Sequence, residues 1–291
     1  MTVRSVRPRR SALYVPGSNA RALAKAGTLP ADVLIVDLED AVAPGAKEEA
    51  RSAAVEAIRR GLGRAEIVLR VNGLDTPWGA ADLAAAAGSG ADAVLLPKVE
   101  GADSVREAGR RLEAGGAPAS MSLWAMVETP RGVLHAEAVA SSSPRMACLV
   151  AGTSDLVKDL RARHTPGRTE VLASLSILVL AARASGLAAL DGVHLDLDDE
   201  AGFAAACRQG RDLGFDGKTL IHPRTLSAAN LEFTPGDSEL ALARRIIEAH
   251  AAAGSAGQGV VVVDGRLVEG LHVAEARRLL DLAAAIEARS G

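Results

Sequence analysis

The stretch Ser122–Gly132, "SLWAMVETPRG", combines an apolar run with an acid at its end. Five apolar residues, Leu123 to Val127, lead directly to Glu128, and Pro130 follows two residues later. A short, continuous apolar run is typical of a strand in a parallel sheet that is buried on both faces, and proline stops such a strand. The stretch therefore predicts a core strand that places the Glu128 carboxylate at a sheet edge, where an acid is either capped by the protein or serves a ligand.

The same pattern recurs along the chain and alternates with amphipathic stretches of helical periodicity. The apolar runs are residues 11–15, 33–37, 66–71, 92–97, 123–128, 146–151, 192–196 and 218–222. The helical stretches are residues 47–60, 77–87, 104–114, 169–185 and 200–213. Eight such units in 291 residues predict an α/β fold, a closed TIM (β/α)8 barrel. No GxGxxG follows the first run, which argues against a dinucleotide-binding sheet.

The chain continues beyond the eighth run with a different pattern. Residues 235–252 predict a helix, 252–259 a linker of small residues, and 272–289 a last helix. Between them, "VVVVDGRLV" (260–268) predicts a hairpin turning at Asp264-Gly265. We therefore expect a barrel domain over residues 1–234 and a C-terminal extension over 235–291, which packs on the barrel or reaches a neighbouring subunit.

Composition narrows the class of partner. A net charge of −3 and an aromatic content of 2% provide neither the basic surface nor the stacking platforms of a nucleic-acid-binding protein. The longest apolar run, residues 175–182, is too short to span a bilayer. The arginine-rich start is not followed by an apolar signal segment, and Cys148 and Cys207 both lie among apolar residues as expected for buried thiols. We expect a cytoplasmic protein without nucleic-acid or membrane partners.

Charged residues gather where the predicted strands end, which is where barrel enzymes carry their active sites. They are Asp37, Glu39, Arg70, Lys98, Glu128 and Asp155. No His or Cys cluster accompanies them, so zinc is not indicated. Carboxylates on adjacent strand ends suit Mg²⁺, which takes one or two carboxylates and keeps several waters. Structural capping of the same acids explains the pattern equally well, and at this point both interpretations stay open.

Two further strand ends carry polar groups. The first run opens into "VPGSNAR", where Gly17, Ser18 and Arg21 form either a phosphate seat at a helix start or a simple Ser18 N-cap. The eighth run ends at His222-Pro223.

Seven motifs in order resemble a known family. They are "SALYVPGSNAR", "VDLEDAV", "LRVNG", "LLPKVE", "VETPRG", "AGTSDL" and "GKTLIHP", spread from residue 11 to beyond 220. The sequence is similar to the citrate lyase β-subunit-like proteins of the HpcH/HpaI aldolase superfamily, which include malyl-CoA and citramalyl-CoA lyases. One motif alone is weak evidence, but seven in the same order are specific.

The resemblance implies a TIM barrel with roles for the strand-end residues. Glu128 and Asp155 would bind Mg²⁺, and Arg70 would contact a carboxyl or enolate oxygen of the substrate. Asp37 and Glu39 would hold the metal's waters and position Arg70.

The resemblance also implies acyl-CoA binding across the barrel mouth, next to Arg21, Lys98 and Pro223. It implies a homotrimer or homohexamer in which a C-terminal segment brings an aspartate to the next subunit's site. Here "GRLVEGLHV" has Glu269 at that position. Glutamate is one methylene longer and can still move a proton; a solvated turn acid is the alternative interpretation.

The function that the resemblance favours is a Mg²⁺-dependent, reversible Claisen-type cleavage of malyl-CoA or citramalyl-CoA. Its products are acetyl-CoA and a 2-oxo acid, glyoxylate or pyruvate. Four alternatives stay open: a malyl-CoA thioesterase or malate-synthase-like enzyme, a citrate lyase β subunit within a complex, a non-catalytic acyl-CoA-binding barrel, and an aldolase for free hydroxy-keto acids with a histidine base. We expect His194 to be a core residue of the seventh strand.

Overall fold

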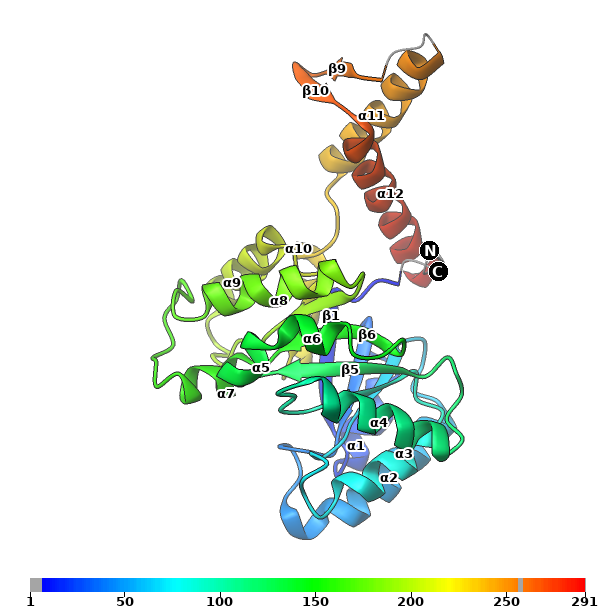
Figure 1. Cartoon of the computed structure of the whole chain (residues 1–291), viewed down its shortest axis with the longest axis vertical. Helices are drawn as coiled ribbons and strands as arrows, with labels where there is room; N and C mark the ends of the chain where they lie inside the picture. Colours follow the sequence, from blue (N-terminus) through cyan, green and yellow to red (C-terminus); the bar gives the residue numbers. More distant parts are fainter. Residues whose placement is uncertain (1–6, 256–258, 291) are drawn as a thin grey trace. The chain divides into compact units, whose positions relative to one another are not determined.

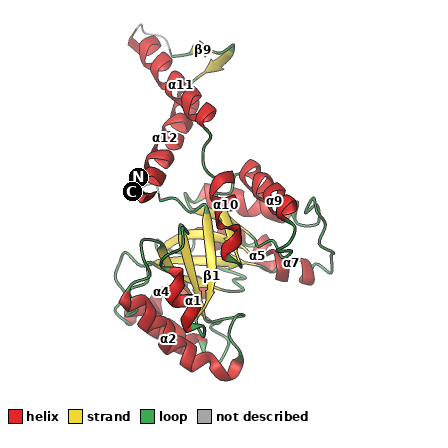
Figure 2. Cartoon of the chain, turned by 180° about the vertical axis from the view of Figure 1, so that it is seen from behind, coloured by secondary structure: helices red, strands yellow, loops and turns green. Residues whose placement is uncertain are grey.

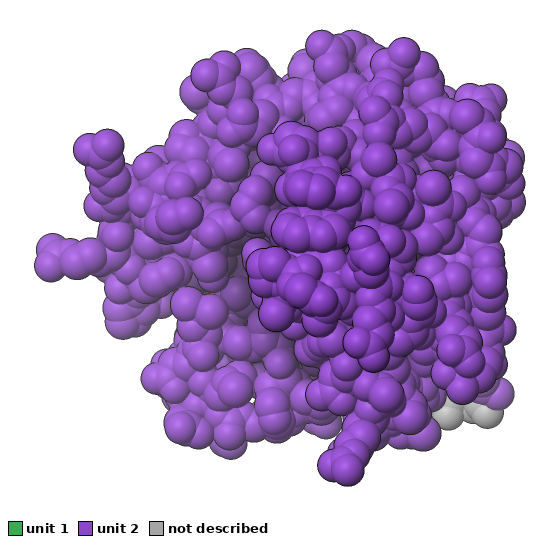
Figure 3. Space-filling model, turned by 90° about the horizontal axis from the view of Figure 1, so that it is seen from below, with its two compact units in different colours: residues 1–8, 234–291 green, residues 9–233 purple. Residues whose placement is uncertain are grey.

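The computed structural model describes residues 7–255 and 259–290. The chain divides into two compact units, one of residues 9–233 and one of residues 1–8 and 234–291. The first of these, residues 9–233, is drawn in purple in Figure 3, where the key numbers it unit 2.

The first unit is a closed barrel of eight parallel strands in sequence order, which confirms the predicted TIM-type fold (Figure 2). Its strands are β1 (Ser11–Pro16), β2 (Val33–Asp37), β3 (Glu66–Arg70), β4 (Ala93–Leu96), β5 (Ser122–Val127), β6 (Met146–Ala151), β7 (Ala188–Asp191) and β8 (Gly217–Leu220). The barrel closes because Ser11, Ala12 and Leu13 of β1 pair in parallel with β8.

Helices connect the strands and cover the outside of the barrel (Figure 1). They are α1 (Ala20–Ala26), α2 (Lys47–Arg60), α3 (Gly79–Ala87), α4 (Ala102–Ala114), α5 (Pro130–Leu134), α6 (Ala136–Ala140), α7 (Thr153–Asp159), α8 (Leu172–Ala184), α9 (Glu200–Leu213) and α10 (Leu226–Glu232), with short 3₁₀ helices η1 (Pro44–Ala46) and η2 (Pro223–Thr225). The bounds of α2 and α9 agree with the predicted ones. Asp199 explains the start of α9, because its side chain caps the helix by accepting a hydrogen bond from Gly202 N at 2.9 Å.

The end of the barrel corrects two predicted strands. β7 is Ala188–Asp191 rather than residues 192–196, and β8 begins and ends slightly earlier than predicted. The position of β7 follows from its pairing, because Leu190 and Asp191 are the residues that pair with β8. The "GVHLD" segment is a loop, so the prediction of His194 as a strand residue is wrong. His194 is half-buried, edge-on to Phe203 at 6.0 Å.

Side chains fill the barrel from within. Alternate strand residues form an interior cluster: Ala12, Val33, Ile35, Val68, Ala93, Leu95, Trp124, Met126, Ala147, Cys148, Val150 and Leu190. The intervening residues pack outward under the helices and form the larger core. Cys148 and Cys207 are both buried, as expected. A filled interior leaves the C-terminal strand ends as the place for a ligand.

The second unit contains α11 (Asp237–Ser255), α12 (Gly270–Ser290) and an antiparallel hairpin of β9 (Val261–Val263) and β10 (Arg266–Val268). Asp264 and Gly265 have φ of 48° and 75°, so both adopt the left-handed conformation that a tight hairpin turn needs. This confirms the predicted hairpin-helix extension. α11 covers the start of the predicted linker, and residues 256–258 lie outside the described residues. No helix of the described part of the chain is long and apolar enough to cross a membrane.

Candidate active site

A buried ion pair joins the ends of β2 and β3. Asp37 and Arg70 are direct neighbours in the parallel ladder. Arg70 donates from Nε to Asp37 Oδ1 at 2.7 Å and from Nη2 to Oδ2 at 2.6 Å. The Asp37 oxygens also accept from the backbone N–H groups of Glu39 (2.8 Å) and Ala41 (3.1 Å). Four donors hold the carboxylate, so the guanidinium has a fixed orientation.

Glu39 links this pair to Lys98. Its Oε2 lies 2.9 Å from Arg70 Nη1, and its Oε1 accepts from Lys98 Nζ at 2.5 Å. Burial raises the pKa of Glu39, against the opposing effects of Arg70 and Lys98. Asp40, next in the chain, is more exposed and lies 3.5 Å from Arg70 Nη1. Three acids of the "DLEDAV" motif thus surround one guanidinium and one ammonium.

Lys98 contacts several carboxylates from a left-handed backbone conformation, with φ of 48°. Its backbone N–H donates to Glu128 Oε1 at 2.8 Å. Its ammonium lies 3.6 Å from Asp155 Oδ2, in addition to the hydrogen bond to Glu39. Burial opposes the charge of Lys98, but the hydrogen bond to Glu39 and the charges of the nearby carboxylates together outweigh it and raise the pKa of the ammonium. Lys98 is therefore a fixed cation among carboxylates.

Glu128 lies directly after β5 with 2% of its surface exposed. Burial raises the pKa of this carboxyl to about 7, while the backbone hydrogen bond from Lys98 acts in the opposite direction. Gly152, the residue after β6, makes room for it, because a Cβ at Gly152 would collide with Glu128 Cβ. Asp155 lies in the first turn of α7, after Gly152, with 30% of its side chain exposed.

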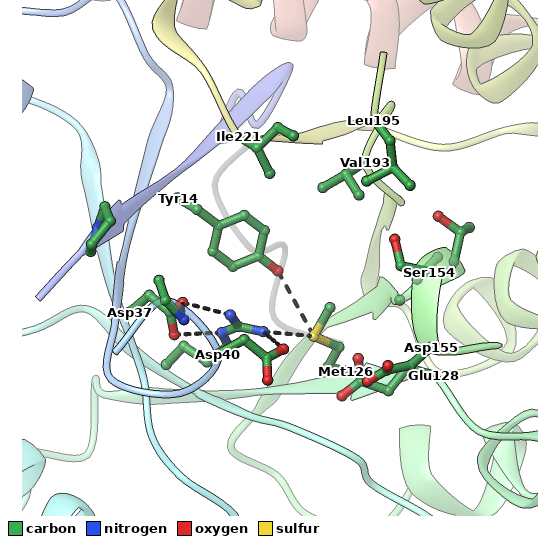
Figure 4. Close-up of a pocket in the computed structure, with 16 residues that line it drawn as sticks. Tyr14, Asp37, Asp40, Met126, Glu128, Ser154, Asp155, Val193, Leu195 and Ile221 are labelled. Atoms are coloured by element: carbon green, nitrogen blue, oxygen red, sulfur yellow. Dashed lines mark hydrogen bonds and ion pairs between the residues drawn. The ribbon is translucent and has the colours of Figure 1, made fainter. Parts of the chain in front are cut away.

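These groups line one cavity of about 380 Å³ at the barrel mouth (Figure 4). Asp37, Arg70, Glu128 and Asp155 all face it, so the structure brings together four of the nine sequence-predicted site residues around this cavity. Glu39 and Lys98 border a neighbouring groove of about 1210 Å³, and Asp40 lines both spaces. The opposite wall of the cavity is apolar and consists of Val193, Leu195 and Ile221.

Tyr14, Met126 and Gly152 are among the cavity residues that sequence reasoning missed. The sequence did contain a signal for Tyr14, the single tyrosine of the chain. It stands two residues after Ala12 on β1, so its side chain points into the barrel as that of Ala12 does. Met126 likewise stands two residues after Trp124 on β5, and both side chains point into the barrel. Strand alternation could have placed both at the top of the barrel interior.

Arg21 and Pro223 do not line this cavity. Arg21 is exposed on α1, and Pro223 opens η2. The cap of α1 is Asn19, whose side chain accepts from Ala22 N at 3.0 Å, so the predicted Ser18 cap is wrong. Glu269 precedes α12 in the other unit, and its backbone N–H donates to His272 Nδ1 at 3.0 Å.

The donor set suits a hard divalent cation. Glu128 and Asp155 offer carboxylates to the same cavity, and within the described residues Glu128 Oε2 has no hydrogen-bond donor. The described part of the chain has no cluster of three or more His, Cys, Asp or Glu side chains arranged as metal ligands. Two carboxylates with room for water and substrate oxygens match the coordination of Mg²⁺.

Comparisons with known proteins agree with the fold. Residues 10–223 match the family model described as HpcH/HpaI aldolase/citrate lyase. The chain is 48% identical to a (3S)-malyl-CoA thioesterase of Cereibacter sphaeroides (strain ATCC 17029 / ATH 2.4.9), over 97% of this chain and 96% of the relative. It is 39% identical to citrate lyase subunit beta of Escherichia coli (strain K12), over 96% and 95%. The crystal structure of CitE from Mycobacterium tuberculosis in complex with magnesium, acetoacetate and coenzyme A is similar, with a TM-score of 0.77 and 32% identity, over 95% of this chain and 98% of that one.

Proposed function

The chain belongs to the HpcH/HpaI aldolase/citrate lyase family, and from its strand-end site we propose that it is a Mg²⁺-dependent acyl-CoA lyase. The proposed reaction is the reversible Claisen-type cleavage of malyl-CoA or citramalyl-CoA to acetyl-CoA and glyoxylate or pyruvate. One observation carries the proposal: a cavity at the strand ends combines a fixed guanidinium, Arg70, with the two carboxylates Glu128 and Asp155. The magnesium and coenzyme A of the solved relative support the same chemistry.

Glu128 and Asp155 are the proposed metal ligands. When bound there, Mg²⁺ supplies Lewis-acid polarisation of the oxygens of the substrate's carboxylate and adjacent hydroxyl. The protein's part is to hold both acids in place. Lys98 orients Glu128 through its backbone N–H at 2.8 Å, and Gly152 leaves space for the glutamate side chain.

Arg70 is the proposed charge-stabilising group. Cleavage turns the hydroxyl carbon into the carbonyl of the 2-oxo acid and leaves the electron pair on the thioester enolate. A guanidinium held beforehand in a buried site stabilises that charge without reorganising. Asp37 fixes its plane with two hydrogen bonds, and Glu39 holds Nη1 and the ammonium of Lys98.

Glu269 is the proposed proton carrier for the acetyl carbon. In cleavage its protonated carboxyl group would give a proton to the enolate carbon, and in condensation the resulting carboxylate would take that proton back. We propose that it comes from a neighbouring chain in a homotrimer or homohexamer. Arg21, Lys98 and Pro223 are proposed to contact the CoA part of the substrate, with Arg21 at the start of the exposed α1 as a cation for phosphate. We also propose a cytoplasmic location.

The test is a product analysis with purified protein, Mg²⁺ and either malyl-CoA or citramalyl-CoA. The proposal expects acetyl-CoA and the 2-oxo acid from wild type. Glu128→Gln and Asp155→Asn are expected to lower kcat by about 10³-fold or more, because Lewis-acid stabilisation of the transition state is lost. Wild-type rates in both variants would rule out the metal site, and absence of acetyl-CoA from every thioester would rule out the lyase.

A second candidate function is thioester hydrolysis, and the 48% identical relative named (3S)-malyl-CoA thioesterase favours it. The same assay separates the two outcomes, because hydrolysis releases free CoA and malate, whereas cleavage retains the thioester in acetyl-CoA. The citrate lyase relative supports a further variant, a β subunit acting within a complex. Activity of the isolated chain on free CoA thioesters would argue against that variant and against a non-catalytic barrel.

A further inference from the structure

Two hydrogen-bond donors of the cavity converge on one sulfur atom. The hydroxyl of Tyr14 lies 3.8 Å from Met126 Sδ, and Arg70 Nη1 lies 3.8 Å from the same atom. Figure 4 shows the Tyr14 hydroxyl directed at Met126, with Glu128 and Asp155 close by. The three side chains come from β1, β3 and β5, so the barrel itself sets their positions.

A thioether sulfur is a weak acceptor for such donors. Tyr14 is half-buried and lines the cavity. Within the described residues its hydroxyl has only this sulfur as a hydrogen-bond partner, although a tyrosine hydroxyl inside a protein normally has a good one. Packing alone does not require the hydroxyl, because a phenylalanine would fill the space of the ring equally well. The hydroxyl therefore needs an explanation other than packing.

The aromatic ring fixes the hydroxyl relative to Arg70. The guanidinium carbon lies 4.8 Å from the centre of the Tyr14 ring, in cation–π geometry. Because Asp37 holds the guanidinium from the other side with two hydrogen bonds, both donors are rigid. Met126, by contrast, has a flexible side chain that adapts to a changing space.

We propose that Tyr14 Oη–H and Arg70 Nη1–H form a two-donor pocket for the thioester carbonyl oxygen of the substrate. Met126 Sδ holds the position that this oxygen takes in the complex, and the methionine side chain moves aside when the thioester enters. This inference rests on the proposed function and extends it to Tyr14, to which nothing above assigns a role. No proton is transferred in this step. The phenol keeps its hydrogen and donates a hydrogen bond to the thioester oxygen as negative charge develops on that oxygen.

The kinetic test is Tyr14→Phe, which keeps the ring over Arg70 and removes only the hydroxyl. We expect kcat to fall by about 10²-fold or more with KM changed by only a few-fold, as for the loss of one oxyanion donor. Ser11→Ala is the matched control. It removes another buried hydroxyl of β1, one that bonds Asn230 Oδ1 at 2.7 Å and does not line the cavity. The control is expected to keep wild-type kcat, and thermal unfolding checks that both variants are folded.

A binding test needs no turnover. Because the chain has one tyrosine, protein labelled with ¹³C at tyrosine Cζ gives a single signal from Tyr14. Titration with acetyl-CoA in the presence of Mg²⁺ is expected to shift that signal in a saturable way. Wild-type kcat in Tyr14→Phe, or a signal that stays unmoved up to saturating acetyl-CoA, would overturn the inference. If wild type cleaves no thioester, the proposed function fails, and the titration still decides the role of Tyr14.

Discussion

Asp37 and Arg70 face each other across the β2–β3 ladder and are joined by two hydrogen bonds, of 2.7 and 2.6 Å. Both side chains are nearly inaccessible to water, with 1% and 7% of their surfaces exposed. Such a pair gains little stability over an apolar pair, but removing one partner leaves an uncompensated buried charge. In the proposed function, the pair holds the Arg70 guanidinium in a fixed orientation.

Asp37→Asn is predicted to lower both stability and activity. The amide removes the charge that compensates Arg70 and puts an N–H group against one of its donors. The free energy of unfolding is expected to fall by about 3 kcal/mol, measured by urea denaturation. Glu56→Gln is the control, because it neutralises one member of an exposed pair with Arg60 at 3.6 Å. That pair is solvent-screened, so we expect wild-type stability within about 0.5 kcal/mol; equal losses in both variants would contradict the prediction.

Glu128 is predicted to make the metal-free protein less stable as pH rises. Burial raises the pKa of this carboxyl from 4.5 to about 7. Between these values the folded protein keeps a proton that the unfolded chain releases, so the free energy of unfolding decreases from pH 4.5 to pH 7, by about 3 kcal/mol in total. In EDTA, Glu128→Gln is therefore expected to match wild type near pH 4.5 and exceed it at pH 7.5.

Adding Mg²⁺ at pH 7.5 gives the complementary measurement. A cation that binds the ionised carboxylate in the folded protein stabilises wild type by mass action, by about 2.7 kcal/mol at one hundred times the dissociation constant. Glu128→Gln is expected to gain much less. An equal gain in both proteins would place the cation elsewhere.

The fold could be predicted because the barrel repeats one simple pattern. Buried parallel strands are continuous apolar runs, and charged residues stand at the ends of these runs. Asp37, Arg70 and Glu128 can therefore be predicted from the sequence to lie at the same end of the barrel. The errors have local causes. "GVHLD" resembles a strand in composition, but pairing with β8 ends at Asp191, and Asn19 rather than Ser18 caps α1.

The rest of the site depends on three-dimensional relations that a sequence does not carry. The hydrogen bond from Lys98 N to Glu128 is made from a left-handed backbone conformation at a non-glycine residue. No local sequence pattern predicts that conformation. The convergence of Tyr14 and Arg70 on Met126 depends on the stagger of three strands. Taken one at a time, none of these residues carries a sequence pattern that marks it as part of a site.

Lys98→Met is predicted to strengthen Mg²⁺ binding. The ammonium lies 3.6 Å from Asp155 Oδ2 and competes with a cation for that carboxylate. Its removal keeps most of the aliphatic stem and is expected to tighten Mg²⁺ binding roughly fivefold, or about 1 kcal/mol, since the pair is half-exposed. Isothermal titration measures this directly. Lys25→Met removes the same charge from the exposed side of α1 and is expected to leave the affinity unchanged. Weaker binding in Lys98→Met would show that the ammonium supports the metal ligands instead of competing with the metal.

Glu269 is predicted to act in the site of a neighbouring chain, and subunit mixing tests this directly. Glu269→Gln and Glu128→Gln are each expected to lose more than about 10²-fold in kcat, as for general acid–base and metal-ligand groups. If each site takes Glu128 from one chain and Glu269 from the next, oligomers co-expressed from both variants contain some sites with both glutamates intact. Random assembly gives about one quarter of such sites, so we expect about a quarter of wild-type activity to return. A site that takes both residues from one chain would regain none, and full activity of Glu269→Gln alone would leave Glu269 as a solvated turn acid.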